Sequence, residues 1–282
     1  MMQSSDKKWI IKSETSIFDV KFKEVAEYRD LLWLLVRRDF VSFYKQTILG
    51  PVWFFIQPLF TIVMYSLIFG GVAGISTDGI PQPLFYLAGI ITWNYFSDCL
   101  IKTSTIFKDN ALIFGKVYFP RLIMPLSLVF SNLVRFAVQI VLFVILMVFY
   151  YIKGSNISMN MYALLFPLLV VLMAILGLGF GMIISALTTK YRDLAFIVTF
   201  GVPLLMYATT VVYPLSATPT KFYWIVKLNP LTPIIEHFRY GFLGSGTISW
   251  PSLIYSAVCS IVVLLLGVLI FNKVEKNFID TV

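Results

Sequence analysis

Long apolar runs with no charge, or with one, are the feature that most restricts what this chain can fold into. A helix needs about 20 apolar residues to cross the ~30 Å hydrocarbon core, because lipid offers no hydrogen-bond partner to an open backbone. Runs that are apolar throughout do not fit the alternating strands of a transmembrane barrel. The sequence therefore predicts an all-α integral membrane protein with six spans, near residues 52–74, 79–101, 122–152, 161–187, 194–213 and 252–271.

The composition of the chain supports the same class of protein. Only 13% of the 282 residues are charged, 59% are hydrophobic, and the mean hydropathy is +0.87. A soluble domain carries roughly 25% charged residues, so a soluble enzyme is disfavoured, and disorder is excluded because it needs low hydrophobicity. Cys99 and Cys259 both lie in apolar runs, where they are expected to be buried hydrophobes rather than a disulfide or metal pair.

The distribution of Lys and Arg predicts the orientation. Six spans put both termini on one side, and that side carries 17 Lys and Arg against 4 on the other. Cytoplasmic loops carry the excess of positive charge, so both termini are predicted to be cytoplasmic. The net charge of +8 fits an anionic lipid surface better than nucleic acid. Residues 1–30 have no apolar signal-peptide core, and the chain is expected to enter the membrane through its first span.

Before the first span, residues 1–29 are expected to form a cytoplasmic segment and residues 30–46 an interfacial helix, with 47–282 forming the six-span domain. On a helical wheel of 30–46, one face is rich in Trp and Phe and the other carries Arg37 and Arg38, although Leu35 falls on the polar side. A helix with this pattern is typical of one that lies in the plane of the lipid headgroups. It either anchors the first span or has a role of its own.

Two connections are not simple loops. Residues 102–121 contain apolar side chains that need a partner, and a short helix near 106–114 is expected to dock on another protein rather than fold back on this chain. Residues 214–250 hold two apolar stretches, 222–228 and 231–243, punctuated by proline and each too short to span. Re-entrant or interfacial half-helices on the outer side fit this pattern, and the alternative is an outer loop without a gating role.

Polar side chains within the spans are functional candidates, because lipid makes them costly. Arg135 could contact an anionic substrate group, but pairing with Asp98 on the neighbouring helix is favoured. Glu236 and Arg239 are three residues apart and are expected to pair on one helix. His237 has no metal-ligand companions, so a structural role is favoured. The candidates in the spans are Gln57, Asn94, Asp98, Asn132, Arg135 and Gln139.

The sequence contains no motif for energy coupling or catalysis. The one Gly-Lys pair, Gly115-Lys116, is followed by Val117 and has Asn110 where a phosphate-binding loop requires glycine. No nucleophile elbow or zinc spacing is present, so neither catalytic nor metal-binding residues are assigned. A transport function would need an external energy source.

An ordered set of short motifs from about residue 20 to the end resembles the ABC-2 type permeases that export polysaccharides. The most particular piece is Lys116-Val-Tyr-Phe-Pro-Arg121 followed by Pro125. The others include Tyr28-Arg-Asp, Tyr44-Lys-Gln-Thr, Phe69-Gly-Gly, Trp93-Asn, Tyr191-Arg-Asp193, Val212-Tyr-Pro214, Asn229-Pro-Leu and Phe238-Arg239. Phe119-Pro-Arg121 and the Trp93-Asn region look closest to the O-antigen branch.

This resemblance implies a half-transporter of a bacterial inner membrane. Members of the family form homodimers and bind two copies of a separate cytoplasmic ATPase, which would hold ATP and Mg²⁺, so no cofactor is expected on this chain. The substrate would be a lipid-linked glycan: O-antigen, capsule or teichoic acid. By the same resemblance, 102–121 corresponds to the coupling region and 214–250 to the outer gate.

Four groups of site residues are expected. Those coupling to the ATPase are Phe107, Asn110, Leu112, Ile113, Lys116, Val117, Tyr191, Arg192 and Asp193. Those lining an aromatic conduit, on which sugar rings slide, are Trp53, Phe54, Phe60, Tyr65, Phe69, Tyr207 and Tyr213. Those holding a lipid-linked pyrophosphate are Arg37, Arg38 and Lys45. Those of the outer gate are Asn229, Pro230, Glu236 and Arg239.

Three rivals remain open. An ABC-2 exporter of a small drug or lipid would share the fold. A membrane enzyme acting on polyprenyl-linked glycans would require clustered carboxylates or histidines at the membrane face, which the sequence lacks. A non-transporting assembly subunit would have no ATPase partner.

Overall fold

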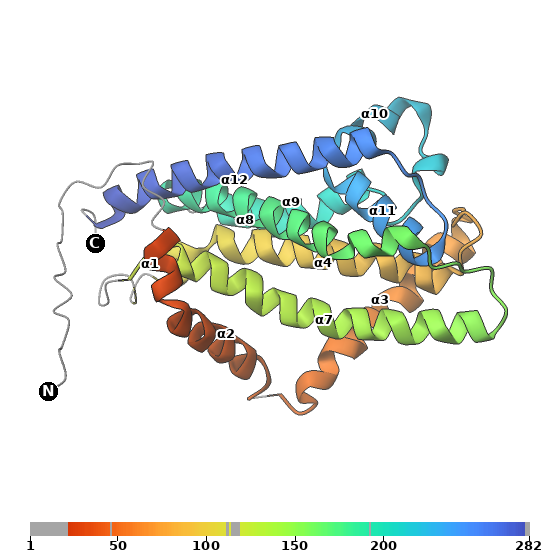
Figure 1. Ribbon diagram of the computed structural model, residues 1–282, viewed down its shortest axis with the longest axis horizontal. Helices are drawn as coiled ribbons and strands as arrows, with labels where there is room; N and C mark the ends of the chain where they lie inside the picture. The colour runs from red at the N-terminus through yellow and green to blue at the C-terminus, as the bar shows by residue number, and fades with distance from the viewer. Residues whose placement is uncertain (1–21, 46, 111–112, 114–118, 192, 280–282) are drawn as a thin grey trace, which may run out of the picture.

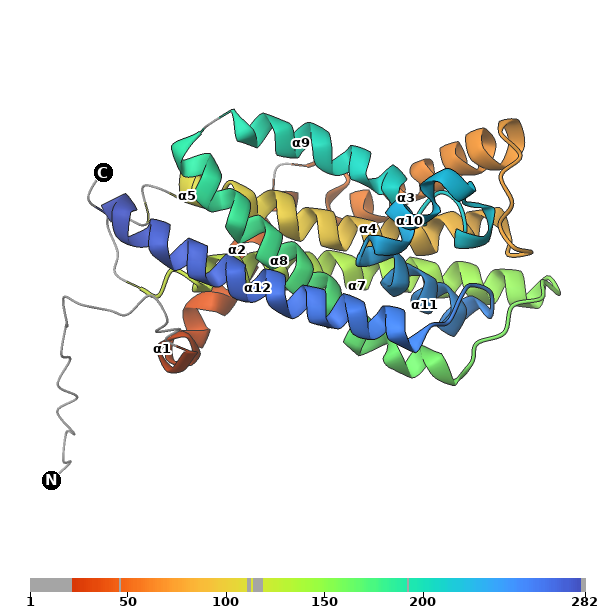
Figure 2. The ribbon, with the colours of Figure 1, turned by 90° about the horizontal axis from the view of Figure 1, so that it is seen from above.

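The computed structural model describes residues 22–45, 47–110, 113, 119–191 and 193–279, and the structural statements below concern those residues. This part of the chain is helical and contains no strand, as predicted. The long helices run side by side along the molecule, and α1 (Phe22–Glu27) lies at the same end as the last turns of α12 (Trp250–Ile279) (Figures 1 and 2).

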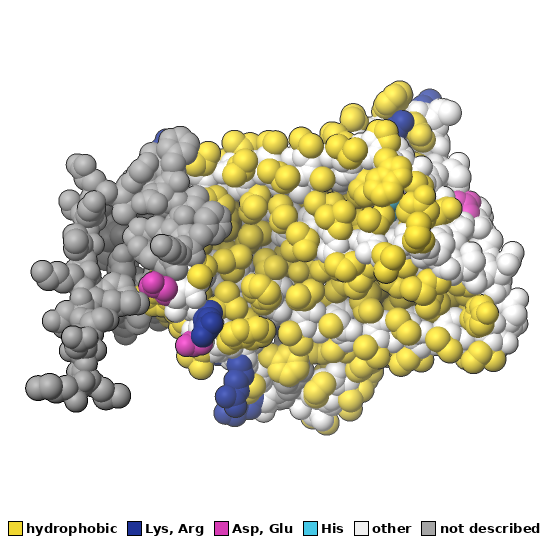
Figure 3. Space-filling view, in the orientation of Figure 1, with side chains coloured by type: hydrophobic (Ala, Val, Ile, Leu, Met, Phe, Trp, Pro, Cys, Tyr) yellow, Lys and Arg dark blue, Asp and Glu magenta, His cyan; other side chains and the backbone are white. Residues whose placement is uncertain are grey.

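Five helical stretches are long and apolar enough to cross a membrane, and they match five of the predicted spans. Figure 3 shows hydrophobic side chains covering the face between the two ends of the bundle. The first stretch, Gly50–Val72, consists of η1 (Gly50–Val52), α3 (Trp53–Tyr65) and the π-helical η2 (Ser66–Val72). The others are α4 (Gln82–Ser104), α7 (Ile123–Ile152), Met161–Thr189 with η3 (Met161–Leu165) and α8 (Phe166–Lys190), and Trp250–Val274 in α12.

The run predicted to span at 194–213 forms a shorter apolar helix, Leu194–Ala208. Here α9 (Leu194–Leu205) ends in a single 3₁₀ turn, η4 (Met206–Ala208), and Thr209 is extended with φ −129° and ψ 170°. Pro203 lies inside α9, where it offers no N–H and crowds the preceding turn. The last residues of the run are therefore not helical, although the run carries no charge.

Short helices occupy 214–250, where the sequence predicts them: η5 (Leu215–Ala217), α10 (Thr220–Leu228) and α11 (Leu231–Leu243). Pro219 stands directly before α10 and Pro230 directly before α11. Proline is tolerated at the start of a helix, where its missing N–H would have no helical partner. Gly244 ends α11 in the left-handed region at φ +76°. Nearly all of α11 is buried against α4, α8, η3 and α12, so this short helix lies within the bundle at one end (Figure 2).

α4 is the central helix of the bundle, packed against α3, α7, α8, α9 and α11. It is mostly buried although its mean hydropathy is the lowest of the five spans. α8 lies between α4 and α12, and the α8–α12 contact depends on two glycines. A Cβ on Gly179 would lie 2.8 Å from the backbone N of Leu264, and one on Gly267 would lie 2.6 Å from the Gly179 carbonyl oxygen. Small residues let membrane helices approach this closely.

The predicted interfacial helix is α2 (Arg29–Tyr44), which packs on α7. Its buried residues are Leu35 and Val36, whereas Arg37 and Arg38 are exposed. Leu35 falls on the polar side of the helical wheel and is nevertheless buried, so the face of α2 that contacts the rest of the protein is rotated from the face that the wheel selects. Trp33 is exposed, with its ring 6.3 Å from that of Phe130.

A second correction concerns the connection after α4, where α5 (Ile106–Asp109) lies within the predicted 106–114. Ile106 and Phe107 are only 1% and 2% exposed. The Phe107 ring stacks on Phe271 of α12 at 4.6 Å. The apolar side chains of α5 therefore find their partner within this chain, not on another protein, because they pack in one buried cluster with Phe271 of α12.

Candidate functional site

The polar side chains singled out within the spans meet in one cavity of about 220 Å³ between α3, α4 and α7. Asn94 and Asp98 are four residues apart on α4, and Arg135 and Gln139 are four apart on α7, so each pair lies on one helix face. Phe54, Tyr95 and Phe136 form the aromatic part of the wall. The polar lining consists of Gln57, Asn94, Asp98, Asn132, Arg135 and Gln139.

Asn132 and Arg135 connect this cavity to its surroundings. Lys102 Nζ donates to Asn132 Oδ1 at 2.6 Å, and Asn132 Nδ2 donates to Cys99 Sγ at 3.7 Å. The Arg135 guanidinium lies 5.6 Å from the centre of the Phe54 ring. Asp98 and Arg135 thus face the same space, as expected of neighbours that could pair.

A second cavity, of about 370 Å³, adjoins the first at Arg135 and extends to α2 and α5. Its wall includes Arg38, whose Nη2 lies 2.9 Å from Asp39 Oδ1, and Ser131 Oγ donates to Asp39 Oδ2 at 3.4 Å. Of the residues predicted to hold pyrophosphate, Arg38 lines this cavity, whereas Arg37 and Lys45 are exposed elsewhere on and after α2. The structure does not gather the three into one cluster.

Aromatic side chains gather where the end of α3 meets the end of α9. The Tyr65 ring lies 5.2 Å from Phe69 and 6.1 Å from Tyr86 of α4. Tyr65 also contacts Met206, at 3.8 Å from its hydroxyl to the sulfur, and Tyr213 donates to the Tyr207 carbonyl at 2.7 Å. This group, which we call the aromatic cluster, comprises Tyr65, Phe69, Tyr86, Tyr207 and Tyr213.

The remaining lining candidates lie away from this cluster. Trp53 and Phe60 are exposed on α3, with Phe60 69% accessible, whereas Phe54 is buried beneath Arg135. Phe54 therefore lines the internal polar cavity rather than an outer face. Sequence reasoning missed Tyr86, since a tyrosine in the middle of an apolar run gives no signal that it will meet two other rings.

The pairing predicted between Glu236 and Arg239 is confirmed, at 3.7 Å in the interior. Arg239 is 1% exposed, and its guanidinium lies 3.6 Å from the centre of the Phe85 ring. It donates to the carbonyl oxygens of Thr210, Val211 and Phe85, the last two at 2.7 and 3.3 Å. A Cβ on Gly89 would lie 2.7 Å from Arg239 Nη2, so only glycine leaves room for it.

The other residues predicted for the outer gate converge on the same place. Asn229 Nδ2 donates to the Ala208 carbonyl at 3.2 Å, while its Oδ1 accepts from the Leu231 N–H at 3.0 Å. Pro230 is the residue before α11. Glu236 Oε2 accepts from the Thr247 N–H at 3.1 Å. The structure thus ties the end of the α9 segment to the junction between α10 and α11 and to Arg239 within α11.

Burial sets the protonation of the two basic groups on α11. Burial lowers the pKa of Arg239 to about 10, opposed by the charge of Glu236, so the guanidinium stays charged at neutral pH. Burial also lowers the pKa of His237, whose Nδ1 lies 2.6 Å from the Pro233 carbonyl oxygen. A neutral, hydrogen-bonded His237 agrees with the structural role favoured for it.

The residues predicted to couple to an ATPase that the structure describes lie at one end of the bundle, where α5 and the α8–α9 connection are neighbours (Figure 2). Thr188 Oγ1 donates to the Ser104 carbonyl at 2.8 Å and joins the two segments. Tyr191 and Asp193 are exposed, Asn110 and Ile113 are half-buried, and Phe107 is buried. Leu112, Lys116, Val117 and Arg192 lie outside the described residues.

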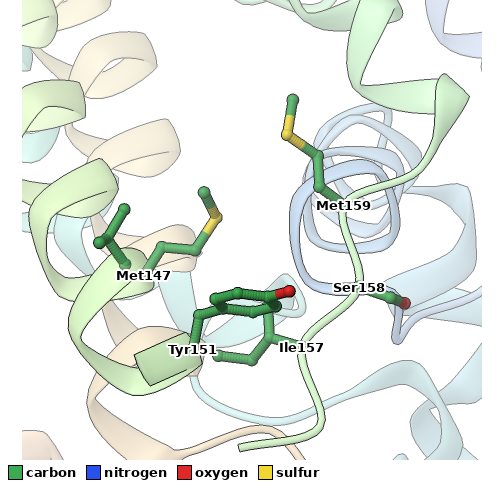
Figure 4. Close-up of a pocket in the computed structure, with 6 residues that line it drawn as sticks. Met147, Tyr151, Ile157, Ser158 and Met159 are labelled. Carbon is green, nitrogen blue, oxygen red and sulfur yellow. The ribbon is translucent and has the colours of Figure 1, made fainter. Parts of the chain in front are cut away.

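A third cavity, of about 490 Å³, lies at the opposite end, between α7 and the segment before η3 (Figure 4). Met147, Tyr151, Ile157 and Met159 surround it with mostly apolar surface, and Ser158 points away from it in Figure 4. It presents no charged side chain, and within the described residues no cluster of His, Cys, Asp or Glu could hold a metal ion.

Five helices long and apolar enough to cross a membrane, a hydrophobic lateral face and a hydrophobic core with one polar cavity define a multi-pass membrane protein. Residues 30–243 match the ABC-2 type transporter family, and the chain belongs to that family. It is therefore the membrane component of a transporter.

Several relatives match over nearly their whole length. The chain is 30% identical to the O-antigen export system permease protein RfbA of Klebsiella pneumoniae, over 89% of this chain and 94% of the relative. It is 27% identical to the protein of the same name in Myxococcus xanthus, over 92% and 98%. The polysialic acid transport protein KpsM of Escherichia coli is 21% identical, over 83% and 89%.

Proposed function

We propose that this chain is the transmembrane permease subunit of an ATP-driven exporter that moves a lipid-linked polysaccharide, O-antigen, from the cytoplasm across the bacterial inner membrane. The observation that carries the proposal is the end-to-end similarity to O-antigen export permeases of two bacteria. The capsule-related relative KpsM is similar at lower identity, so capsule or teichoic acid is the second substrate class.

The energy source is a separate subunit. The chain has no phosphate-binding loop, and membership of the ABC-2 family supports an ABC ATPase partner. In the proposal, two copies of that ATPase bind a homodimer of this chain. ATP and Mg²⁺ would bind on those subunits and no cofactor on this chain. The coupling surface would centre on Tyr191, Asp193 and Asn110, with Phe107 supporting it from beneath.

The membrane topology has six crossings and cytoplasmic termini. In this arrangement the short helix Leu194–Ala208 is the fifth crossing, completed by the non-helical residues after it, and α10 and α11 are re-entrant on the outer side. The excess of Lys and Arg at the opposite end supports this orientation. The proposal keeps the domain boundaries that the sequence predicts, 1–29, 30–46 and 47–282.

The glycan would pass along an aromatic surface. Sugar rings present apolar C–H faces that aromatic rings can hold without strong hydrogen bonds, so a polymer can slide. The aromatic cluster and the exposed Trp53 and Phe60 of α3 are the surface available for this role. Of the three cations predicted to hold the pyrophosphate, Arg38 lines the second cavity and would face the lipid carrier at the cytoplasmic headgroups. Asn229, Pro230, Glu236 and Arg239 would form the outer gate.

The test combines association and export. The full chain is co-expressed with the ATPase encoded beside its gene, purified in detergent, and its stoichiometry measured. The same gene is placed in a strain lacking its own copy, and polysaccharide at the cell surface is quantified. A two-plus-two complex and restored export are expected.

A matched pair of variants locates the coupling surface. Tyr191→Glu changes an exposed tyrosine at the α8–α9 connection, and Tyr151→Glu changes one at the opposite end of the bundle. Loss of the complex is expected for Tyr191→Glu alone. If no ATPase associates with the wild-type chain, the enzyme or assembly interpretation replaces the exporter.

A further inference from the structure

The lining of the cavity between α3, α4 and α7 includes polar side chains that no hydrogen bond within the described part of the protein engages. Asn132 is engaged by Lys102 and Cys99. The side chains of Gln57, Asn94, Asp98 and Gln139 make no hydrogen bond to any other residue that the structure describes. Three amides and one carboxylate therefore direct unmatched donors and acceptors into the same space.

Folding alone does not account for these groups. Inside a membrane bundle a polar side chain without a partner lowers stability, because neither lipid nor packed helices replace water. The face of α4 that carries Asn94 and Asp98 is otherwise set among buried apolar residues. A polar occupant that satisfies several groups at once would offset this cost.

The residue types select among possible occupants. One Arg and one Asp line the cavity, so a phosphate would meet a carboxylate and a cation would meet a guanidinium. The amides offer donors and acceptors together, which matches the hydroxyls of a neutral polyol. Phe54, Tyr95 and Phe136 add aromatic surface for the apolar face of a ring. An acyl chain would leave all of the polar groups unsatisfied.

The size and the opening of the cavity suit one ring. About 220 Å³ is less than the roughly 300–1,000 Å³ of sites for drug-sized ligands. Gln57 is exposed on α3, three residues from Phe60 and on the same side of that helix. The cavity therefore opens beside the aromatic surface along which the glycan would move.

We propose that the cavity lined by Asn94, Asp98 and Gln139 binds a single sugar ring of the exported glycan within each protomer. The inference rests on the proposed function, since it takes the glycan as the substrate. Asp98 and the amide oxygens accept from ring hydroxyls, the amide nitrogens donate to them, and the aromatic wall holds the ring face. The site acts as a resting position between successive movements of the polymer.

The binding test uses the full chain in lipid nanodiscs and saturation-transfer NMR. The probes are the methyl glycosides of galactose, mannose, rhamnose and N-acetylglucosamine, each at millimolar concentration, with inorganic phosphate titrated as a competitor. Wild type is expected to bind at least one glycoside. Asn94→Leu together with Gln139→Met, close in size to the native residues, is expected to weaken binding roughly tenfold because two or more hydrogen bonds are lost.

Matched controls separate the site from the fold. Thr92→Val on α4 and Ser127→Ala on α7 change hydroxyls that bond to backbone carbonyls outside the cavity lining, and wild-type binding is expected. Thermal unfolding checks that every variant is folded. If the double variant unfolds, the single changes Gln139→Met and Asp98→Asn are measured instead, each expected to weaken binding severalfold.

The same variants are tested for export in cells, so that two failures can be told apart. Export by wild type, with unchanged export and glycoside binding in the folded variants, overturns the sugar site but leaves the exporter intact. Absence of export by a folded wild-type chain overturns the proposed function. Two further results would overturn the sugar site. Competition by phosphate that the variants abolish identifies an anion site. No binding of any glycoside to wild type identifies a cavity that holds water only.

Discussion

At the residue scale, Arg239 shows how a charge can be kept inside a membrane protein. Its guanidinium has a carboxylate partner in Glu236, an aromatic face in Phe85 and carbonyl acceptors at Thr210 and Val211. The carbonyls belong to the segment that leaves the helix after Ala208, where backbone groups lack helical partners. Arg239 therefore satisfies the backbone at the point where the short helix ends.

Replacing Arg239 by Gln is expected to lower the free energy of unfolding by about 3–5 kcal/mol, because Glu236 is left buried without its oppositely charged partner. Thermal unfolding in detergent measures the change. Arg239→Lys is expected to recover only part of the loss, since an ammonium cannot serve the same carbonyls while lying flat on Phe85. The double variant Glu236→Gln/Arg239→Gln is the control, and stability below that of Arg239→Gln would contradict this reason.

His237 predicts a dependence of stability on acid pH. Burial holds its pKa in the folded protein below the usual 6.5, so the unfolded chain takes up the proton first as the pH falls. The contribution of neutral His237 is present above pH 6.5 and is lost on acidification towards the folded pKa. The melting temperature of wild type should fall more between pH 7.5 and 5.5 than that of His237→Gln, and equal slopes would contradict the assignment.

At the scale of the element, the contact between α8 and α12 depends on the absence of side chains. Gly179 and Gly267 face one another with backbone atoms closer than any Cβ would allow. In α9, Gly201 has open space, since a Cβ there would lie 4.0 Å from its nearest neighbour, the Ile197 side chain. The two positions differ in packing although both are glycines within apolar helices.

Gly179→Ala is expected to destabilise the protein by about 1–3 kcal/mol, because overpacking forces the helices apart. Gly201→Ala is the matched control and should be neutral or stabilising by up to ~1 kcal/mol, as alanine favours the helix. The melting temperature of each purified variant checks both expectations. Similar destabilisation by the two substitutions would mean that α8 and α12 are not in such close contact.

At the scale of the whole molecule, the two ends of the bundle should face opposite compartments. Lys108 lies on α5 at one end, and Ser216 lies in η5 at the other, beside α10 (Figure 2). The excess of positive charge belongs to the α5 end.

Single cysteines at these positions test the topology, in a background with Cys99 and Cys259 replaced by Ala. In intact spheroplasts, a membrane-impermeant maleimide should label Ser216→Cys and leave Lys108→Cys unlabelled. In inverted vesicles the pattern should reverse. Labelling of both cysteines from the same side would exclude an arrangement in which the bundle crosses the membrane from end to end.

Much of the fold could be predicted from the sequence, because hydrophobic length is a local property. Five spans, the interfacial helix and the short helices α10 and α11 lie where the runs and prolines place them. The predicted fifth span, 194–213, is longer than the helix Leu194–Ala208, since Pro203 and the extended Thr209 end the helix early. Hydropathy counts apolar residues and does not register where a backbone leaves helical geometry.

The candidate site was predictable by residue type rather than by arrangement. Intramembrane polar residues stood out because lipid disfavours them, and the structure brings all six to one cavity. The partners of Phe107 and Tyr86 gave no sequence signal, as an aromatic residue packs equally well against another protein, lipid or its own chain. Arg37, Arg38 and Lys45 are close in sequence, yet α2 turns them to different surroundings.

The sequence by itself determined the class of protein, its helical elements and the missing nucleotide motif, since each depends on residues within a few turns of one another. Tertiary structure alone decided which groups meet. Arg239 and its acceptor Phe85 are 154 residues apart, and the polar cavity joins α3, α4 and α7. Such contacts depend on how helices rotate and approach, which is set by packing between distant segments rather than by the run of residues in any one of them.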